Sequence, residues 1–354
     1  MKQKLKNARA LMEQTKQLQE LPLKIDLTGA RMQTHASLSA TRGILRLAEA
    51  DNDSALLKEA VRVFGAYVSG GMTENYANFN WFSRPDTWTE PCAIVDSMMC
   101  ALSLFRLTGD PAYARLANRI WYNGLGFAQR PNGGFGTDRC VGPAGDVLAP
   151  SGGGISEAYW CCTMRGAEGL RARADGSVYI GEGSDPLSFP DRDTAFKERR
   201  TYDIWLPFST DADFSCDCFS LKLRSSLPAA GTVRLYVTAR TPVFLTFHIY
   251  VPDEAECFRT RTMKLEAGGT GSVEETVSAA ISKKRSADGR RVKYLRGDLL
   301  LGLSEPKDSP LPPEFSAASG GGLSPESIAK LRPINDMIDL SIEEAAGTQR
   351  RILF

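Results

Sequence analysis

The chain has 354 residues, of which 42% are hydrophobic and 24% charged, so it can bury a substantial core and is long enough for two domains. Its 43 basic and 42 acidic residues leave a net charge of +1, which offers no electrostatic attraction to nucleic acid or to an anionic membrane. No stretch approaches the roughly 20 apolar residues that span a bilayer, so we expect neither nucleic acid nor a membrane as a partner.

The first residues, Met1 to Lys6, continue into polar sequence rather than into the apolar segment of a secretion signal. In a chain without such a signal, clustered cysteines are more often metal-binding or catalytic than paired in disulfides. The sequence therefore predicts a cytoplasmic protein. Five scattered cysteines are expected to be small buried residues, namely Cys100, Cys140, Cys216, Cys218 and Cys257.

Helical hairpins are predicted in the first half of the chain. Apolar residues recur at helical spacing over residues 35–50, 56–64, 93–107, 113–122 and 156–170. Gly109 is placed to end one helix, and Asp110-Pro111 supplies the cap and first residue of the next. Two long irregular stretches, 69–89 and 124–154, interrupt the helices, and loops of this length inside a domain are usually functional.

The pattern changes after Ala174 from helical spacing to strand alternation. Apolar residues alternate with polar ones over 219–223, 233–237 and 243–251, and a further strand is predicted over 292–303. A stretch rich in Pro, Gly and Ser, 309–324, reads as a linker, and Ser324-Pro325-Glu326 opens one short helix.

These elements predict a multidomain α and β protein. Repeated helical hairpins with short connections favour a partial (α/α) toroid over a four-helix bundle, and the alternating strands favour an antiparallel β-sandwich after it. The expected divisions are a helical domain over residues 1–174, a β-sandwich over 175–308, and a linker with a C-terminal helix and tail over 309–354.

One group of residues offers three thiols and a carboxylate to a single metal ion. Glu90 and Cys92 lie in the triplet Glu-Pro-Cys, and Cys161 and Cys162 are adjacent. Zn²⁺ accepts thiolate sulfur and carboxylate oxygen in a tetrahedral shell. A thiol that coordinates zinc is deprotonated, which would make it a nucleophile at neutral pH. Glu74, sixteen residues before Glu90, is interpreted as the proton donor of a hydrolytic reaction.

Each of these residues also has a plainer interpretation. Vicinal cysteines without the CxxC spacing are often coincidental, and most glutamates are solvated. His35, near a helix start, is a candidate to hydrogen-bond a substrate hydroxyl, or else a half-buried packing residue. Five aromatic residues flank the candidate site and suit either sugar stacking or core packing, namely Tyr76, Trp81, Trp88, Tyr159 and Trp160.

The ordered set of Glu74, Glu90, Cys92 and the pair Cys161-Cys162 resembles glycoside hydrolase family 127, whose characterised members are β-L-arabinofuranosidases. The likeness covers about Thr34 to Gly169 and includes three further segments, Leu107-Thr108-Gly109-Asp110 with Tyr113, Tyr122-Asn123-Gly124, and Arg296-Gly297-Asp298-Leu299.

The resemblance implies a role for each matching residue. It makes Glu74 the acid/base and Cys161 the nucleophile of a retaining, zinc-dependent hydrolysis of a furanoside, with β-L-arabinofuranose as the expected sugar. It makes Glu90, Cys92, Cys161 and Cys162 the ligands of Zn²⁺, and His35 a substrate-binding residue. An oligosaccharide or glycoside is the expected substrate.

The sequence also departs from the family. The family's catalytic domain is an (α/α)6 barrel, whereas about half that number of helices is predicted here, so the N-terminal half of the barrel is expected to be missing. Thr163-Met164-Arg165 replaces prolines found in many members, and a central-loop tyrosine is replaced near residues 135–137. Two rival hypotheses follow. One is a carbohydrate-binding or interaction protein with a structural zinc site. The other is one part of a split enzyme, whose missing helices come from a partner chain or a neighbouring open reading frame. The expected protein partners are such a complementing chain or further copies of this chain in a homo-oligomer.

Overall fold

The computed structural model describes residues 26–130, 132–140, 148–150, 161–181, 201–208, 210–228, 231–277, 280–285, 292–306, 309–310, 312, 315, 322–337 and 350–354. The helices of the first half are α2 (Thr34–Ala50), α3 (Ser54–Gly70), α4 (Pro91–Thr108), α5 (Pro111–Arg119), the π-helical turn η1 (Ile120–Leu125), α6 (Gly126–Ala128) and α7 (Cys161–Asp175). They correspond to the helices predicted from periodicity, although the part of the last helix predicted before Cys161 lies outside the described residues.

Capping residues set the helix boundaries, and those at Gly109 and Asp110 are the ones predicted from the sequence. The side chain of Asp53 accepts hydrogen bonds from the backbone N–H groups of Ala55 and Leu56 at the start of α3. Gly109 ends α4 in the left-handed conformation, with φ of 70°, which glycine adopts without steric cost. Asp110 then caps α5, with a proline at its first position.

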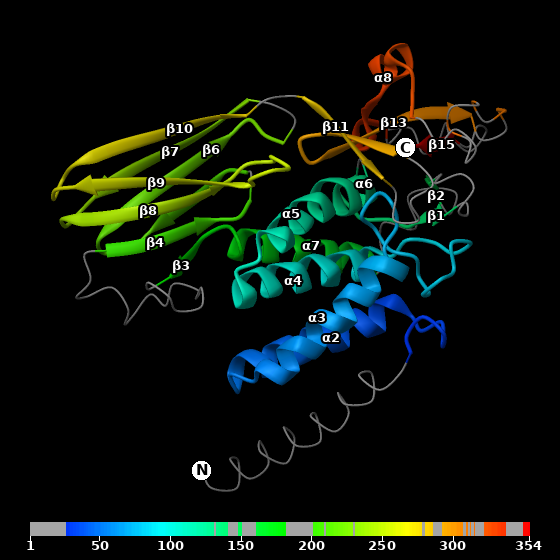
Figure 1. The fold of residues 1–354 in the computed structure, drawn as a ribbon, viewed down its shortest axis with the longest axis horizontal. Coiled ribbons are helices and arrows are strands. Elements are labelled where there is room, and N and C mark those ends of the chain that lie inside the picture. Colours follow the sequence, from blue (N-terminus) through cyan, green and yellow to red (C-terminus); the bar gives the residue numbers. More distant parts are fainter. Residues whose placement is uncertain are drawn as a thin grey trace, which may run out of the picture.

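Helix α4 is the centre of the helical region. It packs against α2, α5 and α7, and nearly all of its residues are buried. By length and composition α4 is apolar enough to cross a membrane, but 78% of its 18 residues are buried inside the protein. Its hydropathy is therefore that of a core helix. Figure 1 shows α4, α5 and α7 between the helix pair α2 and α3 and the large β unit.

Two four-stranded sheets form the large β unit. One has the order β3 (Tyr179–Gly181), β4 (Thr201–Leu206), β8 (Val243–Tyr250), β9 (Phe258–Leu265), and the other has the order β10 (Thr270–Val277), β7 (Gly231–Ala239), β6 (Phe219–Ser225), β5 (Ala212–Ser215). Their inward residues share one apolar core, and Ile204, Leu235 and Phe247 in it are completely buried. The predicted strands over 219–223, 233–237 and 243–251 are confirmed.

The prediction of a purely antiparallel arrangement is wrong at one pair of strands. β4 pairs with β8 in parallel, from Thr201 opposite Phe244 to Leu206 opposite Ile249. The two strands are far apart in the chain, so no hairpin turn sets their direction. The other strand pairs of these two sheets are antiparallel.

A third sheet draws strands from distant parts of the chain. Its order is β1 (Asp138–Cys140), β2 (Leu148–Pro150), β15 (Arg350–Leu353), β13 (Leu299–Pro306), β12 (Val292–Arg296), β11 (Ile281–Arg285), and β14 (Arg332–Pro333) pairs with β13. The single strand predicted over 292–303 is in fact the hairpin β12–β13, which turns at Gly297 with φ of 60°. The segment predicted as linker and tail contributes β14 and β15, as well as the predicted short helix α8 (Pro325–Lys330).

A buried asparagine ties the helical region to this third sheet. Asn123 in η1 donates a hydrogen bond from Nδ2 to the carbonyl oxygen of Asp298 at 2.8 Å, and its Oδ1 accepts one from the N–H of Leu300 at 2.7 Å. Asn123 and Asp298 belong to two of the segments singled out in the sequence, far apart in the chain. The β12–β13 hairpin is thereby fixed against the end of α5 and η1.

Candidate metal centre

The start of α4 brings two of the predicted ligands to one place. Glu90 is the residue before the helix, Pro91 is its first residue, and Cys92 follows in the first turn. The side chain of Glu90 does not cap the helix. It accepts a hydrogen bond at Oε2 from Asn80 Nδ2 at 3.1 Å, and Oε1 lies 3.2 Å from Nδ1 of His35. Anionic side chains at this position are stabilised by the positive end of the helix dipole.

The three predicted cysteine ligands meet at this helix start. The Sγ atom of Cys92 lies 3.8 Å from that of Cys161 and 3.9 Å from that of Cys162, and the three sulfurs are mutually within 4.8 Å. In a tetrahedral shell with Zn–S bonds of about 2.3 Å, two sulfur ligands are about 3.8 Å apart. The spacing of the thiols therefore fits a zinc ion.

Burial and proton affinity differ among the three thiols. Cys92 and Cys162 are buried and Cys161 is exposed. The interaction with Cys92 lowers the pKa of Cys162 to about 7, against the opposing effect of its burial. The same interaction with Cys162, together with burial, raises the pKa of Cys92. One thiol of the cluster thus gives up its proton near neutral pH, as a metal ligand must.

A second group of possible ligands shares Cys92 with the first. His35, Glu90 and Cys92 offer atoms within 4.8 Å of one another. Both ring nitrogens of His35 face carboxylates, Nδ1 toward Glu90 and Nε2 toward Asp96 Oδ2 at 3.5 Å. Hydrogen bonds first to Asp96 and then to Glu90 raise the pKa of His35 to about 9. This raised pKa favours the imidazolium form, which holds Glu90 through Nδ1.

Asp96 holds His35 through its Nε2 atom. Its side chain is completely buried and accepts hydrogen bonds from Ser39 Oγ at 2.6 Å and Arg42 Nη1 at 2.5 Å, both on α2. Arg165 on α7 also binds Asp96. Burial raises the pKa of this carboxyl, but His35, Ser39 and the two arginines outweigh it, so the pKa lies below its ordinary value. One carboxylate therefore joins α2, α4 and α7.

The loop before α4 is held by buried amides and hydroxyls. Asn78 Oδ1 accepts a hydrogen bond from the N–H of Glu90 at 2.8 Å, and Asn78 Nδ2 donates one to Thr34 Oγ1 at 3.0 Å. Thr34, at the start of α2, also donates from its N–H to the carbonyl oxygen of Asn80 at 2.9 Å. None of these three residues was predicted from the sequence as part of the site. Their signal was the repetition of Asn in a loop already marked as functional.

Glu74 belongs to neither group of possible ligands. Its carboxylate Oε2 accepts a hydrogen bond from Lys293 Nζ at 2.8 Å, and its carbonyl oxygen accepts another from the same ammonium at 3.2 Å. Lys293 also lies over the ring of Tyr76, 4.5 Å from its centroid. Its role as acid/base stays a prediction.

Two of the aromatic residues singled out in the sequence are exposed beside the site. Trp81 is 41% and Trp88 46% exposed, whereas Tyr76 is buried. Trp81 pairs with Gln33, and Trp88 with Arg139, through isolated strand bridges. The two indoles are therefore available to a ligand, and Tyr76 packs in the core. Tyr159 and Trp160 lie outside the described residues.

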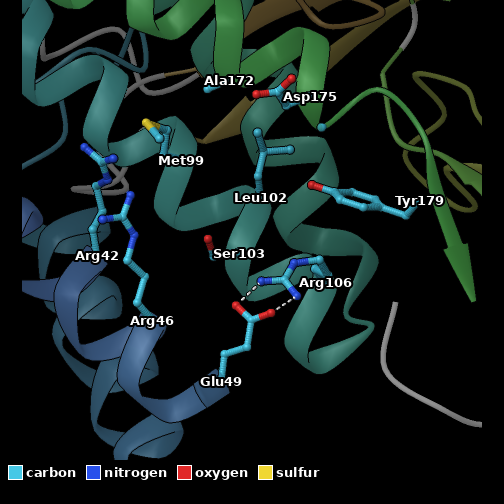
Figure 2. Close-up of a pocket in the computed structure, with 11 residues that line it drawn as sticks. Arg42, Arg46, Glu49, Met99, Leu102, Ser103, Arg106, Ala172, Asp175 and Tyr179 are labelled. Atoms are coloured by element: carbon cyan, nitrogen blue, oxygen red, sulfur yellow. Dashed lines mark hydrogen bonds and ion pairs between the residues drawn. The ribbon is translucent and has the colours of Figure 1, made fainter. Parts of the chain in front are cut away.

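A separate cavity of about 210 Å³ lies toward the other end of α4. Figure 2 shows that Arg42 and Arg46 of α2 line it, with the Glu49–Arg106 ion pair, Asp175 and Tyr179 around them. Arg106 follows Cys92 by fourteen positions on the same helix, which corresponds to about 21 Å at 1.5 Å per residue. None of the predicted site residues lines this cavity.

Comparisons with known proteins agree with the sequence resemblance. Residues 3–175 match the family described as Beta-L-arabinofuranosidase, GH127 catalytic domain. No curated protein matches the chain. Among solved structures, a GH127 beta-L-arabinofuranosidase from Geobacillus stearothermophilus T6 is similar at a TM-score of 0.55 and 16% identity, covering 79% of this chain and 48% of that one.

Two further solved structures are similar. One, described as a glycoside hydrolase, has a TM-score of 0.56 at 14% identity and covers 77% of this chain and 52% of that one. The other, a GH127 beta-arabinofuranosidase, has a TM-score of 0.54 at 14% identity and covers 91% of this chain and 56% of that one. The chain thus spans about half the length of these structures, and the likeness establishes the fold.

Proposed function

Because residues 3–175 belong to the GH127 beta-L-arabinofuranosidase catalytic-domain family, we propose that this chain is a zinc-dependent, retaining glycoside hydrolase that acts on a β-L-arabinofuranoside. One observation carries the proposal, which is the meeting of three thiols at the edge length of a tetrahedral zinc shell. Cys92 reaches its two partners across 69 and 70 residues of sequence. Chance would rarely bring such distant thiols together beside a carboxylate.

The metal would be held by Glu90, Cys92, Cys161 and Cys162. Each carboxylate oxygen of Glu90 has lone pairs beyond those that its hydrogen bonds use, so it can still bind a cation. When bound, zinc would keep its thiol ligands ionised at neutral pH. Cys161 is the nucleophile because it is the exposed thiol of the three, and the other two are buried.

Glu74 is the acid/base of the proposed reaction. The Cys161 sulfur forms a bond to the anomeric carbon while the bond from that carbon to the leaving oxygen breaks, and Glu74 gives its proton to that oxygen. Glu74 then takes a proton from the water that releases the sugar, so the configuration at the anomeric carbon is retained.

His35 is proposed to contact the substrate as well as to hold Glu90. Its side chain is 27% exposed beside the thiols. Both ring nitrogens already face carboxylates, so a sugar hydroxyl near the metal ligands would share an imidazolium N–H with Glu90 or Asp96 as a second acceptor. The exposed rings of Trp81 and Trp88 would stack against the substrate.

The wider setting is also proposed. The hairpins α2–α3 and α4–α5, with α7, are interpreted as part of an (α/α) toroid, and the two four-stranded sheets as a β-sandwich. All eight cysteines are free, which supports residence in the reducing cytoplasm.

A second candidate is supported by the length comparison. The chain covers 48 to 56% of the similar structures. In this second candidate the chain is not an enzyme by itself. It is one part of a split enzyme completed by a partner chain, or a carbohydrate-binding protein that keeps the zinc site for stability.

Metal analysis combined with hydrolysis of 4-nitrophenyl β-L-arabinofuranoside tests the proposal. We expect about one zinc per chain, release of nitrophenol, and retention of configuration by NMR. Cys161→Ala and Glu74→Gln are expected to lose turnover, whereas the matched variant Cys216→Ala, at a half-buried thiol in the connection between β5 and β6, is expected to keep it. An active protein without metal would refute the mechanism. Zinc and sugar binding without turnover would favour the second candidate.

A further inference from the structure

We propose that Lys293 is a positioning residue for Glu74, which holds the carboxyl group in place and stabilises the carboxylate that forms when Glu74 donates its proton. The inference rests on the proposed function, in which Glu74 is the acid/base. Lys293 lies 219 residues after Glu74, on β12 of the third sheet. The sheet would therefore contribute to the reaction, although the proposed nucleophile and metal ligands come from the helical region.

The contact between the two residues is double. The Lys293 ammonium donates to the Glu74 carboxylate at 2.8 Å and to the Glu74 carbonyl oxygen at 3.2 Å. Both side chains are only 13% exposed, so the pair is shielded from solvent. An ammonium that binds side chain and backbone of one residue fixes both its position and its direction. A solvated surface pair would provide neither.

Lys293 is itself held firmly. It is the second residue of β12 and lies opposite Lys284 of β11, whose own charge is paired with Glu254 at 2.7 Å. The ring of Tyr76 lies 4.5 Å from its ammonium. Burial opposes the charge, but Tyr76 and Glu74 outweigh it and hold the pKa of Lys293 above its ordinary value. The group is a fixed cation at neutral pH.

The loop that carries Glu74 is clamped from its other side. The backbone of Tyr76 has φ of 63°, a conformation that residues other than glycine rarely adopt. Its carbonyl oxygen packs so closely on Gly124 that a Cβ there would overlap it. Segment 74–76 is therefore held between η1 and β12. Such strain persists only where the surroundings determine it, and it is concentrated at functional sites.

The chemistry gives the contact its purpose. In the first step the proton moves from the Glu74 carboxyl group to the leaving oxygen, which also takes the electron pair of the broken C–O bond. Glu74 becomes a carboxylate, and its new negative charge develops beside the Lys293 ammonium. A cation placed where charge develops lowers the barrier of that step. In the second step the proton that water gives up returns to Glu74.

The dependence on the leaving group tests this role. A phenyl β-L-arabinofuranoside needs protonation of its leaving oxygen, whereas a 2,4-dinitrophenyl one leaves without it. We expect Lys293→Met to slow the phenyl substrate about 100-fold and the dinitrophenyl substrate far less, with the same pattern in Glu74→Gln. Lys293→Arg should recover part of the loss. Lys222→Met, at an exposed lysine of β6, is the control and should change neither rate.

The outcomes separate the two proposals. If Glu74→Gln shows the leaving-group dependence and Lys293→Met slows both substrates equally, Lys293 is only structural and this inference is overturned. If Glu74→Gln shows no such dependence, the assignment of the acid/base fails first. A thermal double-mutant cycle needs no turnover. The shift in Tm of the double variant Lys293→Met with Glu74→Gln is expected to differ from the sum of the shifts of the two single variants. A double variant whose shift equals that sum would overturn the contact itself. Coupled shifts in a protein that turns over no arabinoside would overturn both proposals.

Discussion

His35 and Glu90 form a pair in which the imidazole Nδ1 lies 3.2 Å from the carboxylate Oε1 of a proposed metal ligand. Groups that orient a metal ligand change metal affinity about 10- to 100-fold when they are removed. His35→Gln should therefore weaken zinc binding by about that factor, and should also raise KM if the imidazole contacts substrate. Competition with a zinc-sensitive dye measures the affinity.

His248→Gln is the control for this change, because His248 lies on β8 and stacks on Trp205, away from the thiols. Unchanged zinc affinity with a raised KM in His35→Gln would leave His35 as a substrate contact alone.

Replacement of Cys92 should abolish the zinc site. Cys92 belongs to both groups of possible ligands, the one with Cys161 and Cys162 and the one with His35 and Glu90, so Cys92→Ser removes a sulfur that the two groups share. The wild-type protein should lose stability on treatment with a chelator, by about 4 kcal/mol relative to free zinc at about 1,000 times Kd. Metal analysis and thermal unfolding with and without chelator measure both effects. A chelator-induced fall in Tm of equal size in Cys92→Ser and wild type would contradict the assignment.

The Asp96 carboxylate should be a main support of the helical region. Its side chain is fully buried between Ser39, Arg42, Arg165 and His35, so Asp96→Asn leaves buried cations without their partner. We expect a loss of about 3 kcal/mol in the free energy of unfolding, measured with urea. The exposed pair Arg84–Asp86 is a matched control, and Asp86→Asn should have a much smaller effect. Equal effects of the two variants would show that Asp96 is not structural.

The Asp96 carboxylate should also make the free energy of unfolding depend on pH in the acidic range. The pKa of Asp96 in the folded protein lies below its ordinary value, so its contribution is present at neutral pH and is lost as pH falls below about 4 and through the folded value. The difference in unfolding free energy between wild type and Asp96→Asn should therefore shrink between about pH 6 and about pH 3. A difference that stays constant over this range would show that the acid dependence of stability comes from a group other than Asp96.

Two glycines in helical segments should respond to alanine in opposite ways. A Cβ at Gly124 would overlap the Tyr76 carbonyl oxygen and approach Ile94, so Gly124→Ala should cost about 1 to 3 kcal/mol and impair the Glu74 loop. A Cβ at Gly65 in α3 meets nothing within 4 Å, so Gly65→Ala should gain about 0.5 to 1 kcal/mol. Denaturant unfolding of both variants measures the signs. A stable Gly124→Ala protein would mean that the Tyr76 segment can move aside.

Much of the helical region was predictable because its boundaries are local. The turn at Gly109 and the Asp110-Pro111 start each act within a few residues. The meeting of Cys92 with Cys161 and Cys162 was proposed from their residue types and supported by the resemblance, since no local rule brings together thiols so far apart.

The rest depends on contacts that the sequence does not display. Asp96 stands alone in the apolar run of α4, which was a signal for a buried charge, but its partners lie on two other helices. Lys293 alternates with Val292 and Tyr294 as a solvent-facing strand residue would, yet its side chain meets Glu74. The parallel pairing of β4 with β8 likewise follows from tertiary packing, because no turn joins the two strands.

Strand order in the third sheet has a consequence for synthesis. β15 pairs with β2 and β13, and its Ile352 and Leu353 are buried, so β2 has to wait for about 200 residues to be made before this partner exists. At about 5 to 20 residues per second the delay is on the order of ten seconds or more. Nascent chains therefore carry an unfinished sheet edge on the ribosome, a natural target for co-translational chaperones.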